Sequence, residues 1–396
     1  MNTSLDKVRD ETRYFVRETL EPALALVSPG GSDEDQFAST RPAYEALVGE
    51  GYLSNLIPVA FGGRGLSASE NFAIIEELAK ANVSVTLTML ATTLGLAPIL
   101  AAAPTETARK LVAPFVRESG APLAAFAFSE PGGTANYNAS GVDRGLATQA
   151  ELGVNGWTVS GAKSWISNSW GWEGKGPDIL TLVAKVPGKG NTVFYSVHPH
   201  ATLRFVEAIE SGGLDGHLLP QIEFHDFRIP PENVIGEVGQ ARPVVEAAFG
   251  SGAGVGALAV GVARRAFDFV QAWAAQTTLR GDSYLLDSDR FAYALIEQKI
   301  RLEAIAAVVD RAARAIDSRS SNAFELGLVS KIFVSETATQ IVIDLANLLG
   351  VRSLSTDHPL ASMIQESLYF PLVSGSNHGF RRPQIVDLLR EQMSVS

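Results

Sequence analysis

The chain has 396 residues, of which 46% are hydrophobic and 19% are charged, and its formal net charge is −11. This composition indicates a compact globular protein of more than one domain and excludes a largely disordered chain. The negative charge argues against nucleic acid or an anionic membrane as a partner, because both require a basic surface. The absence of cysteine excludes disulfides, thiolate metal ligands and a cysteine nucleophile.

We find no targeting signal in the first residues and no membrane span in the most apolar stretch. Residues 1–7 contain neither an apolar signal core nor a twin-arginine signal, so we expect a cytoplasmic protein. Residues 83–103 are the most apolar part of the chain, but Thr, Ser, Gly and Pro occur throughout. We expect a buried helix pair there and not a membrane span. The six histidines are scattered, so no metal site is predicted.

The apolar pattern changes twice along the chain. Helical spacing in the first part gives way to short alternating runs at 157–160, 181–184, 193–197 and 222–227, and long helical patterns return at 292–318 and 323–349. The pattern therefore predicts an N-terminal α-helical domain (1–120), a middle β domain (121–232) and a C-terminal helical bundle domain (233–396).

The middle domain contains two motifs about thirty residues apart. Residues 126–134 read Phe-Ala-Phe-Ser-Glu-Pro-Gly-Gly-Thr, and residues 161–168 read Gly-Ala-Lys-Ser-Trp-Ile-Ser-Asn. Alone, the first is ordinary turn chemistry and the tryptophan of the second is typical of a protein core. A third motif, Leu-Val-Ser-Gly-Ser-Asn-His-Gly-Phe-Arg-Arg, covers residues 372–382. The three together resemble the acyl-CoA dehydrogenase superfamily along the whole chain, and among its members the nitroalkane oxidase pattern.

The resemblance implies an α+β acyl-CoA dehydrogenase fold with an N-terminal helical domain, a middle β-barrel-like domain and a C-terminal four-helix bundle. It also implies bound FAD, with Trp165 covering the ring and Ser167 reaching its N5 region. The flavin tail would be held partly across a subunit boundary, so the resemblance implies a homodimer or homotetramer. The flavin-binding residues implied are Phe126, Phe128, Ser129, Thr134, Trp165, Ile166, Ser167, Arg280, Asn347, Gly350, Ser376 and His378.

The third motif departs from the family at one decisive place. The family pattern there is Tyr-Glu-Gly-Thr-Asn-x-x-x-Arg, in which the Glu removes the substrate's α-proton, and nitroalkane oxidase uses an Asp. This chain has Ser374. A neutral serine hydroxyl does not deprotonate a carbon acid, and residues 249–256, the alternative site, contain no carboxylate. That small-residue run is interpreted as close helix packing or as room for substrate.

A similar loss of the base occurs in a monooxygenase branch that includes actinomycete sugar-amine N-oxygenases and indole hydroxylases. There a separate flavin reductase supplies reduced flavin, dioxygen adds at the C4a position, and an electron-rich substrate attacks the hydroperoxide. We therefore expect a two-component monooxygenase of secondary metabolism that hydroxylates an indole-like aromatic compound or an amine. The expected catalytic residues are Ser374 and His378, and the expected substrate contacts are Trp170, Ser251, Gly252, Tyr369 and Ser374.

Three alternatives stay open at this point. A flavin oxidase or dehydrogenase could use a non-standard base such as His378. A non-catalytic flavin-binding protein is the second. The third concerns one residue: Trp170 could equally well belong to the protein core instead of a substrate pocket. The family has a Phe and a Gln after the position of Arg280, and this chain has Ser283 and either Asp289 or Arg290 in their places. The flavin could therefore be bound loosely, which suits an enzyme that takes reduced flavin from solution.

Overall fold

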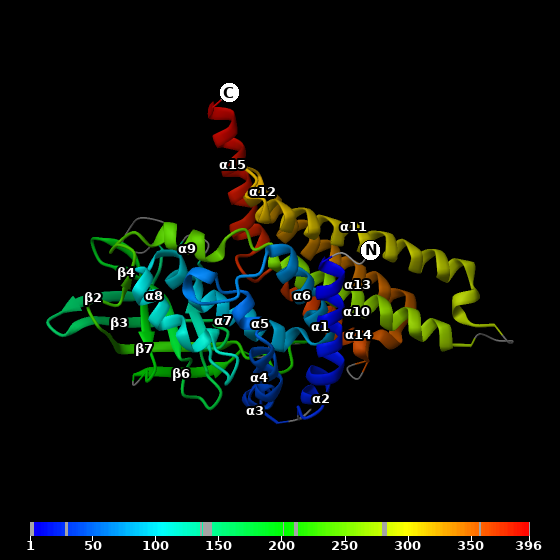
Figure 1. Cartoon of the computed structure of the whole chain (residues 1–396), viewed down its shortest axis with the longest axis horizontal. Coiled ribbons are helices and arrows are strands. Elements are labelled where there is room, and N and C mark those ends of the chain that lie inside the picture. Colours follow the sequence, from blue (N-terminus) through cyan, green and yellow to red (C-terminus); the bar gives the residue numbers. More distant parts are fainter. Residues whose placement is uncertain are drawn as a thin grey trace.

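The computed structural model describes residues 4–27, 31–134, 137, 145–200, 202–209, 213–278, 283–355 and 358–395. Figure 1 shows the sheet on the left, a bundle of long helices on the right, and N-terminal helices between them. The last helix, α15 (Arg382–Val395), projects from this body. The arrangement confirms the expected fold class, with helical, sheet and helical parts in chain order.

The N-terminal part is a set of packed helices whose starts follow local capping chemistry. Ser32 and Ser67 each form a capping box: the serine hydroxyl accepts from the third helical amide, and the acidic side chain of that third residue accepts from the serine amide. The helices are α1 (Ser4–Phe15), α2 (Glu21–Leu24), α3 (Asp33–Ser39), α4 (Arg41–Glu50), α5 (Tyr52–Asn55), α6 (Ala68–Ala81), α7 (Val83–Ala102) and α8 (Thr105–Val112).

The predicted helix pair at 83–103 is wrong, because α7 is one helix that continues through Pro98. Its side chains are apolar on all sides, since it lies between the N-terminal helices and the sheet. Gly95 allows this approach: a Cβ atom there would lie 2.5 Å from the backbone carbon of Ala124. By length and composition α7, residues 241–276 and residues 323–354 could each cross a membrane, yet more than half of each apolar window is buried in this fold.

The middle part is a mixed sheet with strand order β6-β7-β3-β2-β4-β5-β8, in which β1 runs parallel to β4. All four short runs predicted from alternation lie in strands. The strands are β1 (Ala124–Ala127), β2 (Gln149–Gly153), β3 (Gly156–Lys163), β4 (Ile179–Val186), β5 (Gly190–Val197), β6 (Leu203–Ala208), β7 (Pro220–Ile229) and β8 (Val234–Ile235). Among the described strands, the two ends β6 and β8 are not paired with each other.

The C-terminal part is the expected helical bundle. The helices α10, α11, α13 and α14 pack against one another, and α10 also packs on α6. A π-helical segment, η5 (Ser330–Val334), joins α12 directly to α13, so the pattern predicted for 323–349 forms one long helix. The helices are α9 (Ala241–Phe249), α10 (Gly254–Gln276), α11 (Asp289–Asp317), α12 (Ala323–Val329), α13 (Ser335–Leu349) and α14 (Pro359–Tyr369).

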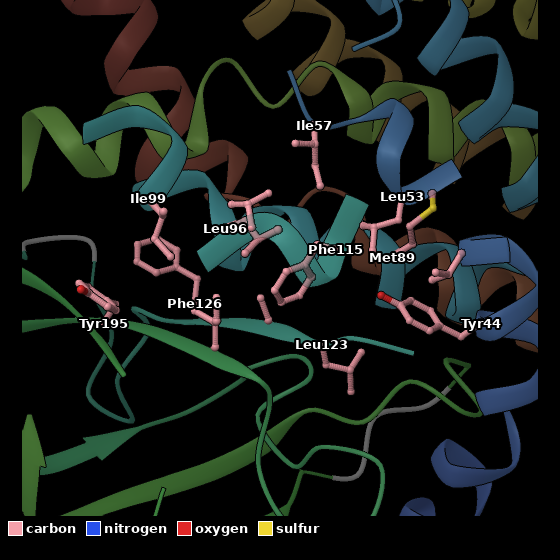
Figure 2. Close-up of a cluster of buried hydrophobic side chains, with 14 of the residues drawn as sticks. Tyr44, Leu53, Ile57, Met89, Leu96, Ile99, Phe115, Leu123, Phe126 and Tyr195 are labelled. Carbon is pink, nitrogen blue, oxygen red and sulfur yellow. The ribbon is translucent and has the colours of Figure 1, made fainter. Parts of the chain in front are cut away.

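The core beneath β1 joins the first two parts. Figure 2 shows Leu96 and Ile99 of α7 beside Phe126 of β1 in a continuous apolar cluster. The Tyr44 hydroxyl lies at its edge, 3.0 Å from the Thr92 hydroxyl, and donates to the Pro122 carbonyl. Because the end of β1 leads directly into residues 128–134, this core fixes where the first motif lies.

Candidate flavin site

A buried ion pair joins the first two motifs. The Lys163 ammonium donates to Glu130 Oε1 at 2.9 Å and to the Phe128 carbonyl, and both charged side chains are almost completely buried. Glu130 also accepts from the amides of Ala147 and Thr148. Burial lowers the pKa of Lys163 to about 8, while the charge of Glu130 opposes that fall. The sequence interpretation gave neither residue a role, although both belong to the quoted motifs.

The turn that follows β3 presents the predicted ring-binding residues. Trp165 has a positive φ of 63° and its side chain is 52% exposed, whereas Ile166 beside it is buried. Asn168 holds the turn, because its amide donates to Thr88 O, Thr92 Oγ1 and the Ala124 carbonyl. An exposed indole on such a rigid turn can cover a planar ring. These residues therefore fit a flavin.

The polar end of the first motif lies against this turn. The Ser129 carbonyl accepts from the Ser164 amide at 3.0 Å, and Thr134 is half-buried in the turn that follows β1. Phe126 and Phe128 are buried and stack with ring centroids 5.8 Å apart. The Ser129–Ser164 bond thus joins the first two motifs, which hold the residues predicted around the flavin ring.

A histidine that was missed lies behind Ser167. The Ser167 hydroxyl is 3.0 Å from His217 Nε2, and His217 Nδ1 is 3.3 Å from Thr88 Oγ1. Burial lowers the pKa of His217 to about 4, so the ring is neutral near pH 7. Tyr369 completes this cluster: its ring centroid is 6.4 Å from that of His217, and hydrogen bonding to Ser167 opposes the rise in its pKa that burial causes.

The third motif forms a strained turn around a buried arginine. Ser374 has a φ of 52°, a left-handed conformation that is uncommon for serine. The Arg381 guanidinium is fully buried and donates to the carbonyls of Ser374, Gly250 and Phe249. It also donates to Gln384 Oε1. Among the described residues no carboxylate bonds this guanidinium, and burial lowers the pKa of Arg381 to about 10.

The rest of the motif is anchored to the bundle by a second π-helical segment, η7 (Asn377–Arg381). Buried Asn377 accepts from Lys331 and donates to Ser335 and Glu336. Ser376, a predicted flavin residue, accepts from the Gly379 amide and caps the segment. His378 is exposed, and within the described residues no contact joins it to Ser167, His217 or Tyr369.

Two groups of predicted substrate contacts pack against other parts of the chain. Gly252 faces the guanidinium, because a Cβ atom there would lie 2.9 Å from Arg381 Nη2, and Ser251 packs tightly against Gly327. Close packing therefore accounts for Ser251 and Gly252, whereas a Cβ atom on Gly250 would meet nothing within 4 Å. Trp170 packs on Phe205 of β6, with ring centroids 4.9 Å apart, which supports the core-packing alternative, and its contact with substrate stays a prediction. Tyr369 does lie beside Ser167, as described above.

The residues predicted for the flavin tail are remote from the ring site or undescribed. Arg280 lies outside the described residues. Asn347 and Gly350 are exposed at the end of α13. That helix begins beside η7, and its length puts Asn347 roughly 18 Å further along the bundle. Contact of Asn347 or Gly350 with flavin across a subunit boundary stays a prediction.

The fold and these joined motifs define a flavin-dependent oxidoreductase. Residues 2–119 match the N-terminal domain of acyl-CoA dehydrogenase, and residues 244–382 match its C-terminal domain. The chain belongs to the acyl-CoA dehydrogenase superfamily. It is 31% identical to nitroalkane oxidase of Fusarium oxysporum (96% of this chain, 92% of the relative) and 34% identical to that of Podospora anserina (95% and 92%).

Solved structures agree with this placement. The Podospora anserina nitroalkane oxidase superposes with a TM-score of 0.91 at 30% identity, covering 98% of this chain and 96% of that one. For nitroalkane oxidase, a flavoprotein, an active-site mutant with asparagine in place of aspartate was crystallised with 1-nitrooctane. The roles of that aspartate and of an arginine seven residues further on were studied in its reaction. A fold relative, the acyl-CoA dehydrogenase of Bacillus anthracis (TM-score 0.85, 20% identity, 100% and 68% coverage), was solved with FAD.

Proposed function

We propose that this protein is a FAD-dependent monooxygenase that takes reduced flavin from a separate flavin reductase and hydroxylates an electron-rich small molecule. One observation carries the proposal. Ser374 stands seven residues before Arg381, the same spacing as the aspartate and arginine of nitroalkane oxidase, and its hydroxyl is not a base at neutral pH. The Arg381 guanidinium donates its hydrogen bonds to backbone carbonyls and Gln384, so it needs no carboxylate partner at position 374.

Two described residues near the motif, Glu336 and His378, are poor substitutes for that base. Glu336 is the carboxylate bonded to the motif, but it pairs with Arg382 through two hydrogen bonds of 2.9 Å. Hydrogen bonding from Arg382 lowers the pKa of Glu336, which makes it a poor proton acceptor. Exposed His378 makes no contact with the Ser167 cluster. Neither Glu336 nor His378 therefore supports abstraction of a carbon-bound proton, and oxygen transfer to a nucleophilic substrate requires no such base.

When bound, reduced FAD supplies two electrons, so that one atom of dioxygen enters the substrate and the other leaves as water with two protons. The chain's own residues enclose and orient the reactants. Trp165 covers the ring and Ser167 faces its N5 region, which is the placement we propose for these two residues. A site of this kind must exclude water, and the surrounding apolar side chains serve that purpose.

Aromatic side chains favour an aromatic or apolar amine substrate. Phe249 bridges the first and third motifs, with its ring centroid 5.5 Å from Phe126, 5.3 Å from Phe128 and 5.5 Å from Phe380. Tyr369 adds a hydroxyl beside Ser167. The aromatic faces of this wall favour a neutral, indole-like ring.

The proposal is tested with isotopically labelled dioxygen. The purified protein is mixed with FAD, a flavin reductase and NADH, and a panel of indoles and aliphatic amines is supplied. We expect one labelled oxygen atom in a product, dependent on both reductase and protein. Turnover of nitroalkanes with oxidised FAD, without reductase and with no label from dioxygen in the organic product, would favour an oxidase with a non-standard base.

A further inference from the structure

A buried histidine lies beside Ser167, the residue proposed to face flavin N5. His217 lies in the loop between β6 and β7, and no motif contains it. The loop is held close to α14, because a Cβ atom on Gly213 would lie 2.4 Å from Gln365 Cβ. This places the imidazole between α7, the turn after β3 and the end of α14. Its side chain is 5% exposed.

The hydrogen bonds around this ring determine its tautomer. The Thr88 hydroxyl has two neighbours, the Ser84 carbonyl at 3.1 Å and His217 Nδ1 at 3.3 Å. We assign its single proton to the nearer one, the carbonyl, which makes His217 Nδ1 the donor to Thr88 Oγ1. A neutral ring protonated at Nδ1 leaves a lone pair on Nε2, which accepts the Ser167 hydroxyl proton at 3.0 Å. The oxygen of Ser167 then presents lone pairs to its other neighbours.

We propose that His217 is a positioning residue that makes the Ser167 hydroxyl a hydrogen-bond acceptor and thereby favours reduced flavin. The inference rests on the proposed function, which places Ser167 at flavin N5. Oxidised flavin has a lone pair at N5 and needs a donor there, whereas reduced flavin has an N–H and needs an acceptor. A serine whose proton is committed to His217 suits the reduced form, as an enzyme that receives reduced flavin requires.

The test compares the affinities of oxidised FAD and dithionite-reduced FAD under nitrogen, together with the midpoint potential of bound FAD. His217→Leu frees the Ser167 proton to donate to oxidised flavin. We expect the ratio of reduced to oxidised affinity to fall roughly two- to tenfold, the scale of one hydrogen bond, and the potential to become more negative. His217→Gln, whose amide oxygen can accept the same proton, should restore the ratio.

A matched control exists elsewhere in the chain. His200 is buried, lies 3.1 Å from the Ser196 hydroxyl through Nδ1 and bonds the Pro177 carbonyl through Nε2, but it is outside the flavin motifs. His200→Leu should leave the affinity ratio unchanged. Thr88→Val removes the acceptor that fixes the tautomer without opening a cavity, and it should lower the ratio in the same direction as His217→Leu. If His217→Leu does not fold, the affinity ratio of Thr88→Val tests the proposal in its place.

Two results would overturn the inference: an unchanged or increased preference for reduced FAD in His217→Leu or Thr88→Val, or an equal shift in His200→Leu. Neither readout uses turnover or dioxygen. Loss of the proposed oxygenase activity would therefore leave this test intact, and a failed affinity shift would leave the oxygenase proposal standing.

Discussion

Ser374 is the residue at which this chain departs from the pattern of its relatives. Ser374 lies in a left-handed turn, and its backbone carbonyl accepts a hydrogen bond from Arg381. The guanidinium is thus held by the backbone of Ser374 and not by its side chain. Among the described residues the Ser374 hydroxyl has no hydrogen-bond partner. Under the proposed function, the Ser374 hydroxyl is available to position substrate.

Ser374→Ala should lower the turnover of the reductase-coupled reaction by less than about tenfold, because only one positioning hydrogen bond is lost. Steady-state oxygenation of the best substrate measures this. A loss of a hundredfold or more would be typical of a removed acid–base group and would contradict the assignment.

His217 should also shape the pH dependence of folding. Its pKa falls from an ordinary value of 6.5 to about 4 on burial, so the unfolded chain binds the extra proton between these values. Above about pH 6.5 the histidine is neutral in both states and costs no stability. As the pH falls from 6.5 towards 4, the unfolded chain is protonated before the folded one, so the unfolding free energy falls by on the order of 3 kcal/mol in all. Urea unfolding at a series of pH values should show a shallower acid loss for His217→Gln than for wild type. His225→Gln, at an exposed position, serves as the control and should match wild type.

At the scale of elements, the Glu130–Lys163 pair fixes the turn after β1 against the end of β3. Lys163→Met leaves a buried carboxylate without its partner, and we expect a loss of roughly 3–5 kcal/mol in unfolding free energy together with weaker FAD binding. Glu130→Gln combined with Lys163→Met removes both charges and should recover part of the stability. Lys175→Met, in the exposed pair with Glu173, should change stability by less than about 1 kcal/mol. Equal effects at the two lysines would show that the buried pair does not hold the motifs.

The elements themselves were largely predictable because their signals are local. Alternation of period two located β3, β4, β5 and β7, and helical spacing located α11 to α13. The continuity of α7 through Pro98 was not predictable, because packing on both sides overrides the local break. His217 was missed for a related reason: only the fold brings its loop beside Ser167. Gly252 was misjudged because the guanidinium that fills its space comes from Arg381, far along the chain.

At the scale of the whole molecule, exposed apolar faces indicate association. Tyr293, Ile296 and Ile300 recur on one face of α11 and are 70%, 55% and 59% exposed. The projecting helix α15 exposes Val386, Leu389 and Met393. Such faces are typical of subunit contacts. They fit the prediction that Asn347 and Gly350 act across a boundary.

We therefore expect a homodimer or homotetramer by light scattering. Ile296→Glu combined with Ile300→Glu should produce smaller species and weaken FAD binding, because a charge in an apolar contact is costly. Val154→Glu, at a fully exposed turn, should change neither property. A wild-type monomer that binds FAD tightly would remove the argument.

The most direct test of the account is anaerobic mixing of the protein, loaded with oxidised FAD, with candidate substrates. The oxygenase account predicts that no candidate reduces the flavin, so the absorbance of oxidised FAD should persist with nitroalkanes, acyl-CoA esters, indoles and amines alike. Bleaching by any of these at a catalytic rate would contradict the oxygenase account and would require a base among the residues around the flavin.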